Sequence, residues 1–150
     1  MAVHSATCDE AVLSIIGGPW HFMQGDVRSI GGLGIDTWAE AEVVLSLCAV
    51  GGIDSHLQRC DVGVRGKMES RCVLDRTVVE FCGAIEGYGV RLSEKAEATL
   101  RGCTVRDCAI GVCLERDVSA VFANSTLYRC HLAPLYCGVS ARRVFCRIAQ

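Results

Sequence analysis

Apolar and small residues recur along this chain in a pattern that repeats after about 22 residues. The segment 98–108 (ATLRGCTVRDC) aligns with the segment 120–130 (AVFANSTLYRC). In each segment the apolar or small residues fall at relative positions 1, 3, 6, 8 and 11. This spacing is typical of short β-strands that alternate in and out and are separated by a bend, not of a helix. Self-similarity at this period predicts a stacked repeat.

Five copies of the repeat can be aligned, and they agree in four columns. The first column holds Trp20, Val43, Cys72, Ala98 and Ala120, and the second holds Phe22, Leu45, Leu74, Leu100 and Phe122. The third holds Gly25, Cys48, Thr77, Cys103 and Ser125, and the fourth holds Val27, Val50, Val79, Val105 and Leu127. Strand alternation places all four columns in the core, where Trp20 and Phe22 are expected to fill the first coil.

A second recurring element, an apolar–Gly–apolar strand, precedes each later copy by ten residues, at 33–35, 62–64, 88–90 and 110–112. The spacing between copies varies, so the extra residues are expected in loops at Asp54–Asp61 and Gly83–Gly87. Residues 1–18 are interpreted as an N-terminal cap or an incomplete first coil, with a strand at 11–16. Residues 19–150 are interpreted as the repeat, which restarts near residue 143 with Phe145 at the position of Phe122.

The strings GVRLSEKAEATLRGCTVRDC and GVCLERDVSAVFANSTLYRC resemble the repeat of the pectin-lyase-like superfold. A leucine-rich repeat would need Leu at most of these positions and an Asn ladder, and neither is present. The resemblance covers roughly residues 11–148 and implies an all-β fold, a right-handed single-stranded parallel β-helix of about five coils. This superfold serves lyases, hydrolases, epimerases, phage tailspikes and eukaryotic interaction domains, so it leaves function open. The chain looks most like the β-helix segments of F-box proteins and of SHC-binding, spindle-associated proteins.

Composition fits a single β-helical domain of 150 residues. The hydrophobic content of 51% and the mean hydropathy of +0.32 suit strands that all face one continuous core. The longest stretch without charge, 11–25, is interrupted by Gly-Gly-Pro and is too short for a membrane span. No secretory signal is recognisable at the N-terminus, so an intracellular, cytoplasmic location is expected. The net charge of −2 and the scattered Lys and Arg residues argue against nucleic-acid binding.

The eleven cysteines are expected to be reduced. Cys48 and Cys103 fall in the third column, and Cys82, Cys108 and Cys130 fall in a fifth inward column. In-register side chains on stacked coils keep their Cβ atoms about 4.8 Å apart, which is too far for a relaxed disulfide. Buried cysteine behaves as a small hydrophobe, so free-thiol ladders are predicted. No C-x-x-C motif is present and the histidines lie on different rows, so no metal site or cofactor is predicted.

Candidate binding residues lie on the outer side of the Gly-containing strands. If these strands alternate, Gly34, Gly63, Gly89 and Gly111 point outward and form a shallow trough. Beside the trough runs an outward column of Asp36, Arg65, Arg91 and Cys113. Asp36, Arg65 and Arg91 are therefore candidate binding residues, and the alternative is that they are solvated surface charges. Asp54 and His56, on the longest loop, are further candidates.

No catalytic residues are predicted, because no two carboxylates align at the spacing that glycoside hydrolysis requires. The favoured hypothesis is a non-catalytic scaffold or protein-interaction module. The alternative is a carbohydrate-binding or carbohydrate-active module, lyase- or hydrolase-like, that uses the Gly-lined outer face. The expected partner is a protein, or a second copy that associates end to end through the incomplete C-terminal coil, with a glycan as the alternative.

Overall fold

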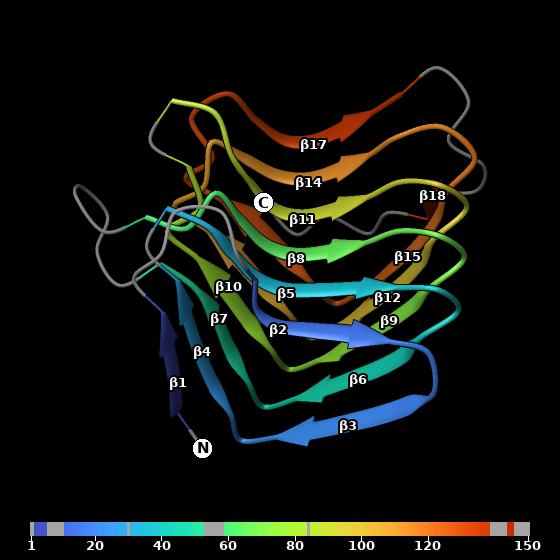
Figure 1. Ribbon diagram of the computed structural model, residues 1–150. Coiled ribbons are helices and arrows are strands. Elements are labelled where there is room, and N and C mark those ends of the chain that lie inside the picture. The colour runs from blue at the N-terminus through green and yellow to red at the C-terminus, as the bar shows by residue number, and fades with distance from the viewer. Residues whose placement is uncertain are drawn as a thin grey trace.

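The computed structural model describes residues 2–5, 11–29, 31–52, 59–83, 85–138 and 144–145, and every regular element in these ranges is a β-strand. The strands form three parallel sheets (Figure 1). Sheet A holds β1 (Ala2–Ser5), β4 (Asp26–Ser29), β7 (Ala49–Gly51), β10 (Val78–Glu80), β13 (Thr104–Arg106) and β16 (Thr126–Tyr128). Sheet B holds β2 (Ala11–Ile16), β5 (Leu33–Trp38), β8 (Val62–Gly66), β11 (Tyr88–Leu92), β14 (Ile110–Leu114) and β17 (Ala133–Cys137). Sheet C holds β3 (Pro19–Met23), β6 (Glu42–Ser46), β9 (Arg71–Asp75), β12 (Glu97–Arg101), β15 (Ser119–Ala123) and β18 (Val144–Phe145).

The chain winds through the three sheets in turn, so each coil contributes one strand to each sheet and the coils stack as a β-solenoid of about five turns (Figure 1). This confirms the predicted all-β, parallel stacked fold. The predicted register is also found, since Leu45 pairs with Leu74 and Leu74 pairs with Leu100. No helix in the described part of the chain is long and apolar enough to cross a bilayer.

The core follows the predicted columns. The second column is fully buried from Leu45 through Leu100, and the fourth is fully buried from Val50 through Val105. The three sheets therefore enclose one continuous hydrophobic interior, in which each side chain packs against its equivalent one coil above and below.

The prediction for the first coil is wrong at Trp20. Trp20 keeps its expected partner Val43 in the sheet, yet its side chain is 51% exposed and its indole nitrogen donates to the Gly17 carbonyl at 3.0 Å. Phe22 is partly buried against the core. Among the described strands β3 is the last at its end of sheet C, so no described strand of this sheet covers the far side of Trp20.

At the other end of sheet C the register differs by one residue from the prediction. Val144 pairs with Ala120, so Phe145 lies opposite Val121 and not opposite Phe122. The last copy of the repeat is short, so its sequence pattern does not distinguish two registers that differ by one residue.

The corners between sheets B and C are made by stacked pairs of residues with positive φ. Ala39 and Glu40 have φ of 55° and 61°, and Met68 and Glu69 have φ of 53° and 61°. The coils are tied together at these corners, since the Glu40 nitrogen donates to the Met68 carbonyl at 3.1 Å. None of these residues is Gly or Asn, the usual residues at positive φ, so the sequence gives no local turn signal here.

Candidate functional site

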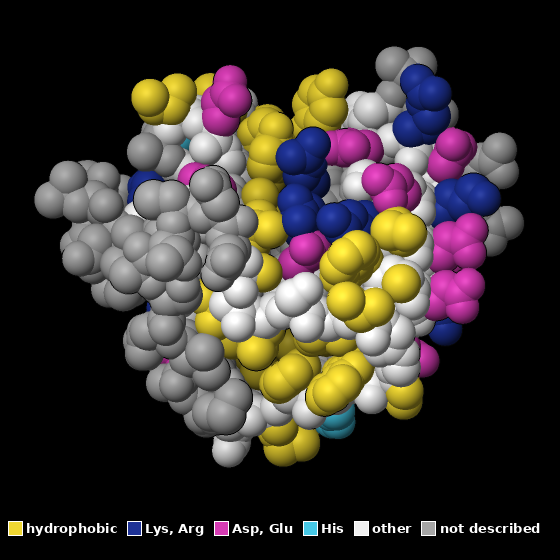
Figure 2. All heavy atoms as spheres, viewed as in Figure 1, with side chains coloured by type: hydrophobic (Ala, Val, Ile, Leu, Met, Phe, Trp, Pro, Cys, Tyr) yellow, Lys and Arg dark blue, Asp and Glu magenta, His cyan; other side chains and the backbone are white. Residues whose placement is uncertain are grey.

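The outer face of sheet B carries the three charged residues singled out in the sequence. Asp36 on β5 pairs in register with Arg65 on β8, which pairs with Arg91 on β11. The strands of sheet B run across the centre of Figure 1, and Figure 2 shows basic and acidic side chains gathered on the upper half of this face. The column of candidate residues is therefore present as one continuous row across three coils.

Asp36 and Arg65 form a bidentate ion pair. The Arg65 Nε donates to Asp36 Oδ1 at 2.9 Å, and its Nη2 donates to Oδ2 at 2.7 Å. Asp36 is only 6% exposed although it lies on the outer side of the strand. Hydrogen bonding to Asp36 raises the pKa of Arg65, and partial burial opposes this shift. The pairing fixes the Arg65 guanidinium in one orientation on the face.

Lys67 extends the cluster toward the edge of the sheet. Its Nζ lies 3.9 Å from Asp36 Oδ2 and 4.8 Å from the centroid of the Trp38 ring. A cation held over an indole face has both an electrostatic and a packing partner. Lys67 is therefore held on this face by Asp36 and Trp38 together.

Arg91 has partners of its own. It donates from Nε to Glu115 Oε1 at 2.6 Å, and its guanidinium lies 5.0 Å from the centroid of the Tyr88 ring. The side chains of Arg91 and Glu115 are 38% and 35% exposed. Cys113, the next residue in the predicted column, is almost fully buried. The column of charged side chains therefore ends at Arg91, and on β14 its position is occupied by the buried thiol of Cys113.

A groove of about 520 Å³ lies over these charges. It is lined by Arg65, Lys67, Arg91, Ser93, Glu94, Lys95, Glu115, Arg116 and Asp117. Figure 2 shows the corresponding hollow, with Lys and Arg side chains at its centre, acidic side chains around them and a run of hydrophobic side chains along one side. The groove has mixed charge, and its basic residues are largely paired with carboxylates.

The glycine column does not form an outer trough, so that part of the prediction is wrong. A Cβ at Gly89 would meet the Gly111 carbonyl oxygen and Val105 Cγ1, each at 2.6 Å, and the Cys108 Sγ at 3.3 Å. Gly63 and Gly111 have the same kind of surroundings. These glycines face the interior because the strand bends at the corner between sheets A and B. The residue before Gly89 lies toward the outside instead, since the Tyr88 ring contacts Arg91, whereas Val62, before Gly63, is buried.

Asp54 and His56 lie outside the described residues, within the gap at 53–58. After this gap, Cys60 forms an isolated parallel bridge with Cys82. In the second expected loop a Cβ at Gly83 would lie 2.4 Å from the Gly87 Cα. The close approach of these two glycines agrees with the tight reversal predicted there.

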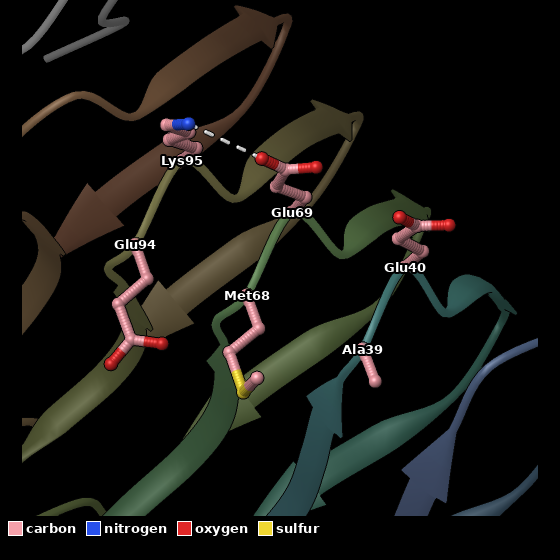
Figure 3. A pocket seen from close by; sticks show the side chains of 6 residues that line it. All are labelled: Ala39, Glu40, Met68, Glu69, Glu94 and Lys95. Atoms are coloured by element: carbon pink, nitrogen blue, oxygen red, sulfur yellow. Dashed lines mark hydrogen bonds and ion pairs between the residues drawn. The ribbon is translucent and has the colours of Figure 1, made fainter.

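A second open pocket of about 520 Å³ lies over the stacked corners between sheets B and C. In Figure 3 the side chains of Glu40, Glu69 and Lys95 point to one side of the corners, and those of Met68 and Glu94 point to the other. Lys95 pairs with Glu69 at 3.3 Å. Sequence reasoning missed this ladder of charges, because nothing in the repeat marks these positions as corners.

A third cluster, on the outer face of sheet A, was also missed. Glu80 accepts from Arg28 at 3.0 Å through Oε1 and from Arg106 at 2.6 Å through Oε2, and its side chain is only 10% exposed. Arg28 and Glu80 are two coils apart, and the register places Gly51 between them. Because Gly51 has no side chain, Arg28 can reach Glu80 directly. Hydrogen bonding to Glu80 raises the pKa of Arg106.

We expect Glu80→Gln to lower the free energy of unfolding by about 2 kcal/mol, because two guanidinium groups lose their shared and largely buried counter-charge. Arg106 is partly solvated, so the cost is smaller than for a fully buried ion pair. Glu97→Gln is the matched control. Glu97 pairs with Arg71 at 3.2 Å but is 53% exposed, so its loss should cost under about 0.5 kcal/mol. Urea denaturation of both variants measures the difference, and equal midpoints would contradict this role for Glu80.

Two carboxylates of the face, Asp36 and Glu115, are each bonded to an arginine. Within the described ranges, no group of three or more His, Cys, Asp or Glu side chains is arranged to hold a metal ion. What the arrangement offers chemically is a set of oriented hydrogen-bond donors and acceptors on a rigid sheet.

Comparisons with models of protein families, with curated proteins and with solved structures found no match to this chain.

Proposed function

We propose that this protein is a non-catalytic β-helix module that binds a partner protein through the outer face of sheet B. The observation that carries the proposal is the fixed row of charges on this face. Arg65 is held by Asp36 at 2.9 and 2.7 Å, Arg91 by Glu115 at 2.6 Å, and Lys67 by the Trp38 ring. Side chains that are already ordered lose little conformational entropy when a partner binds.

The charge pattern favours a polypeptide partner. The groove presents basic side chains next to Glu94, Glu115 and Asp117, so a partner must supply both acidic and basic groups to match it. A polyanion such as an acidic polysaccharide would meet these carboxylates as well as the arginines. An extended peptide segment with mixed charge fits the groove better.

We infer that the coils wind right-handedly, as in the pectin-lyase-like β-helices that the repeat resembles. A connection between parallel strands of one sheet is almost always right-handed. The similarity in style to eukaryotic β-helix interaction domains points to the same class of function.

A cytoplasmic location is also proposed. It is supported by the nine cysteines in the described part of the chain, all of which are free thiols. End-to-end self-association through the C-terminal coil remains a prediction, and most of residues 139–150 lie outside the described ranges.

The binding proposal can be tested with a random-peptide display library selected on the purified protein. Selected peptides should lose at least about tenfold in affinity, or about 1.4 kcal/mol, on the double variant Lys67→Ala/Arg91→Ala. Arg65 is left in place because Asp36 would otherwise remain buried without its main partner. Isothermal titration calorimetry gives the dissociation constants.

The matched control is Arg71→Ala/Arg101→Ala, which removes the same charge from the outer face of sheet C, where both residues are exposed. Its affinity for the selected peptides should equal that of the unmodified protein. Equal binding by both double variants, or no enrichment of any peptide, contradicts the proposal. Binding on a glycan array that is lost only in Lys67→Ala/Arg91→Ala would favour the carbohydrate alternative.

A further inference from the structure

The outer face of sheet C carries a stripe of uncharged, β-branched side chains. The stripe is formed by the central residues of four successive strands, β6, β9, β12 and β15 (Figure 1). These residues pair in register, and they are Val44, Val73, Thr99 and Val121. The two neighbours of each residue along its strand are buried, so the stripe faces outward. Val121 is 42% exposed, and the other three are partly exposed.

Four charged residues frame the centre of this stripe. Arg71 begins β9 and Glu97 begins β12, and their side chains pair at 3.2 Å. Asp75 ends β9 and Arg101 ends β12, and these two residues are neighbours in register. The four charges therefore form a rectangle, about 13 Å along the strands and about 4.8 Å across them, with opposite signs at adjacent corners. The side chains of Arg71 and Glu97 are 58% and 53% exposed, so a partner can reach both charges.

A rectangle with this alternation of charge is complementary to itself. A second copy can be placed on the face by a two-fold axis that runs along the stacking direction of the coils. This axis reverses the strand direction of the second copy and keeps its coils at the same level. Arg71 of each copy then lies opposite Asp75 of the other. Glu97 likewise lies opposite Arg101, and the uncharged stripes meet between them, which gives the apolar centre and polar rim of a protein interface.

The charges around the rectangle select this orientation. The rim at the strand starts is acidic, because a hollow of about 360 Å³ there is lined by Glu40, Glu42, Glu69, Arg71, Lys95 and Glu97. In Figure 3 the side chains of Glu40, Glu69 and Lys95 point to the same side of the corners. The rim at the strand ends is basic, with Asp75, Arg76 and Arg101. A two-fold axis parallel to the strands would place two acidic rims together, whereas the axis along the stacking direction places each acidic rim opposite a basic one.

We propose that two copies of this chain associate through the outer faces of sheet C, side by side and with their strands antiparallel. The five strands from β3 to β15 cover about 16 Å by 24 Å, or about 400 Å² in each copy. A standard interface buries about 800 Å² on each partner. The dimer is therefore weak and forms at high protein concentration. Sheet B stays open in this dimer, so the inference is independent of the proposed binding of a peptide.

The first test uses the unmodified protein, kept in reductant because Cys137 is exposed. Sedimentation velocity between roughly 10 µM and 1 mM should show a shift from monomer to dimer. Small-angle scattering at the highest concentration should fit a particle that is wider than the monomer and no longer along the stacking direction. A monomer throughout the series, or a stack twice as long as the monomer, would overturn the proposal.

Charge reversal tests the orientation of the two copies. Glu97→Arg and Arg101→Glu should each raise the dissociation constant at least about tenfold, because like charges then meet across the two-fold axis. An equimolar mixture of the two variants should dimerise again. In the mixed dimer one ion pair is reversed in sign and the other is unchanged, so both remain attractive. A mixture that stays monomeric overturns the antiparallel arrangement.

Val121→Asp tests the uncharged stripe, since it places two carboxylates opposite each other at an exposed position and should abolish the dimer. Glu86→Arg is the matched control for Glu97→Arg. Glu86 is exposed in the turn between β10 and β11, away from sheet C, so the variant should dimerise like the unmodified protein. Association that Val121→Asp leaves intact contradicts the proposal. Circular dichroism checks the fold of each variant, and the scattering of the unmodified protein decides if a variant does not fold.

Discussion

Gly89→Ala is expected to destabilise the fold by about 3 kcal/mol, because the new methyl group would enter occupied space. It would lie 2.6 Å from the Gly111 carbonyl oxygen, which belongs to the backbone of the next coil and cannot move without disturbing the ladder. The reduced entropy of the unfolded chain favours Ala by about 0.4–1 kcal/mol, which is too little to offset the clash. Urea denaturation measures the change.

Gly138→Ala is the matched control. Its new Cβ would have its nearest neighbours at 3.3–3.6 Å, so we expect a change within about 1 kcal/mol. If Gly89→Ala were as mild as the control, the glycine would face solvent as simple alternation predicts, and an outer trough would exist after all. The experiment therefore separates the two descriptions of this face.

The glycine column shows why part of the site could not be predicted from the sequence. Alternation is reliable inside a straight strand, and it places Val90 inward and Arg91 outward correctly. It fails where the strand bends at a corner, because Gly89 and Val90 then both face the interior. A bend of this kind leaves no signal beyond the glycine itself, and a glycine is also compatible with an exposed trough.

The core could be predicted because it depends only on repeat register. The repeat pattern of the sequence is enough to align Leu74 with Leu100, and the two residues pair in sheet C. The place of Cys60 beside Cys82 could not be predicted, because Cys60 falls within the predicted variable loop and has no position in the repeat register. The prediction for Trp20 is wrong because repeat register alone assumes a neighbouring coil on both sides of every residue, and β3 is the last described strand of sheet C.

The charged face was predicted only as a column. Repeat register places Asp36, Arg65 and Arg91 on successive strands, and the structure agrees. It does not specify which carboxylate each arginine selects. Arg65 pairs with Asp36 inside the column, whereas Arg91 turns to Glu115 at the edge of the next strand. Such choices depend on rotamers and on neighbouring rings, which a repeat alignment does not contain.

Leu100→Ala should lower the free energy of unfolding by about 2–5 kcal/mol, through lost burial and the cavity that remains. Leu100 is fully buried and has Leu74 on one side and Phe122 on the other in sheet C. In a stacked repeat each coil is stabilised by its neighbours, so a defect in a central coil weakens two interfaces at once.

Thr99→Ala is the control for that variant, since Thr99 lies one residue away on the outer face, between Val73 and Val121, and is partly exposed. Its loss should cost less than about 1 kcal/mol. The two substitutions lie on the same strand of the same coil, so the difference between the urea midpoints of the two variants reports which of the two side chains faces the core. A one-residue slip would exchange the two faces, so a larger cost for Thr99→Ala than for Leu100→Ala would show that the register of sheet C is shifted.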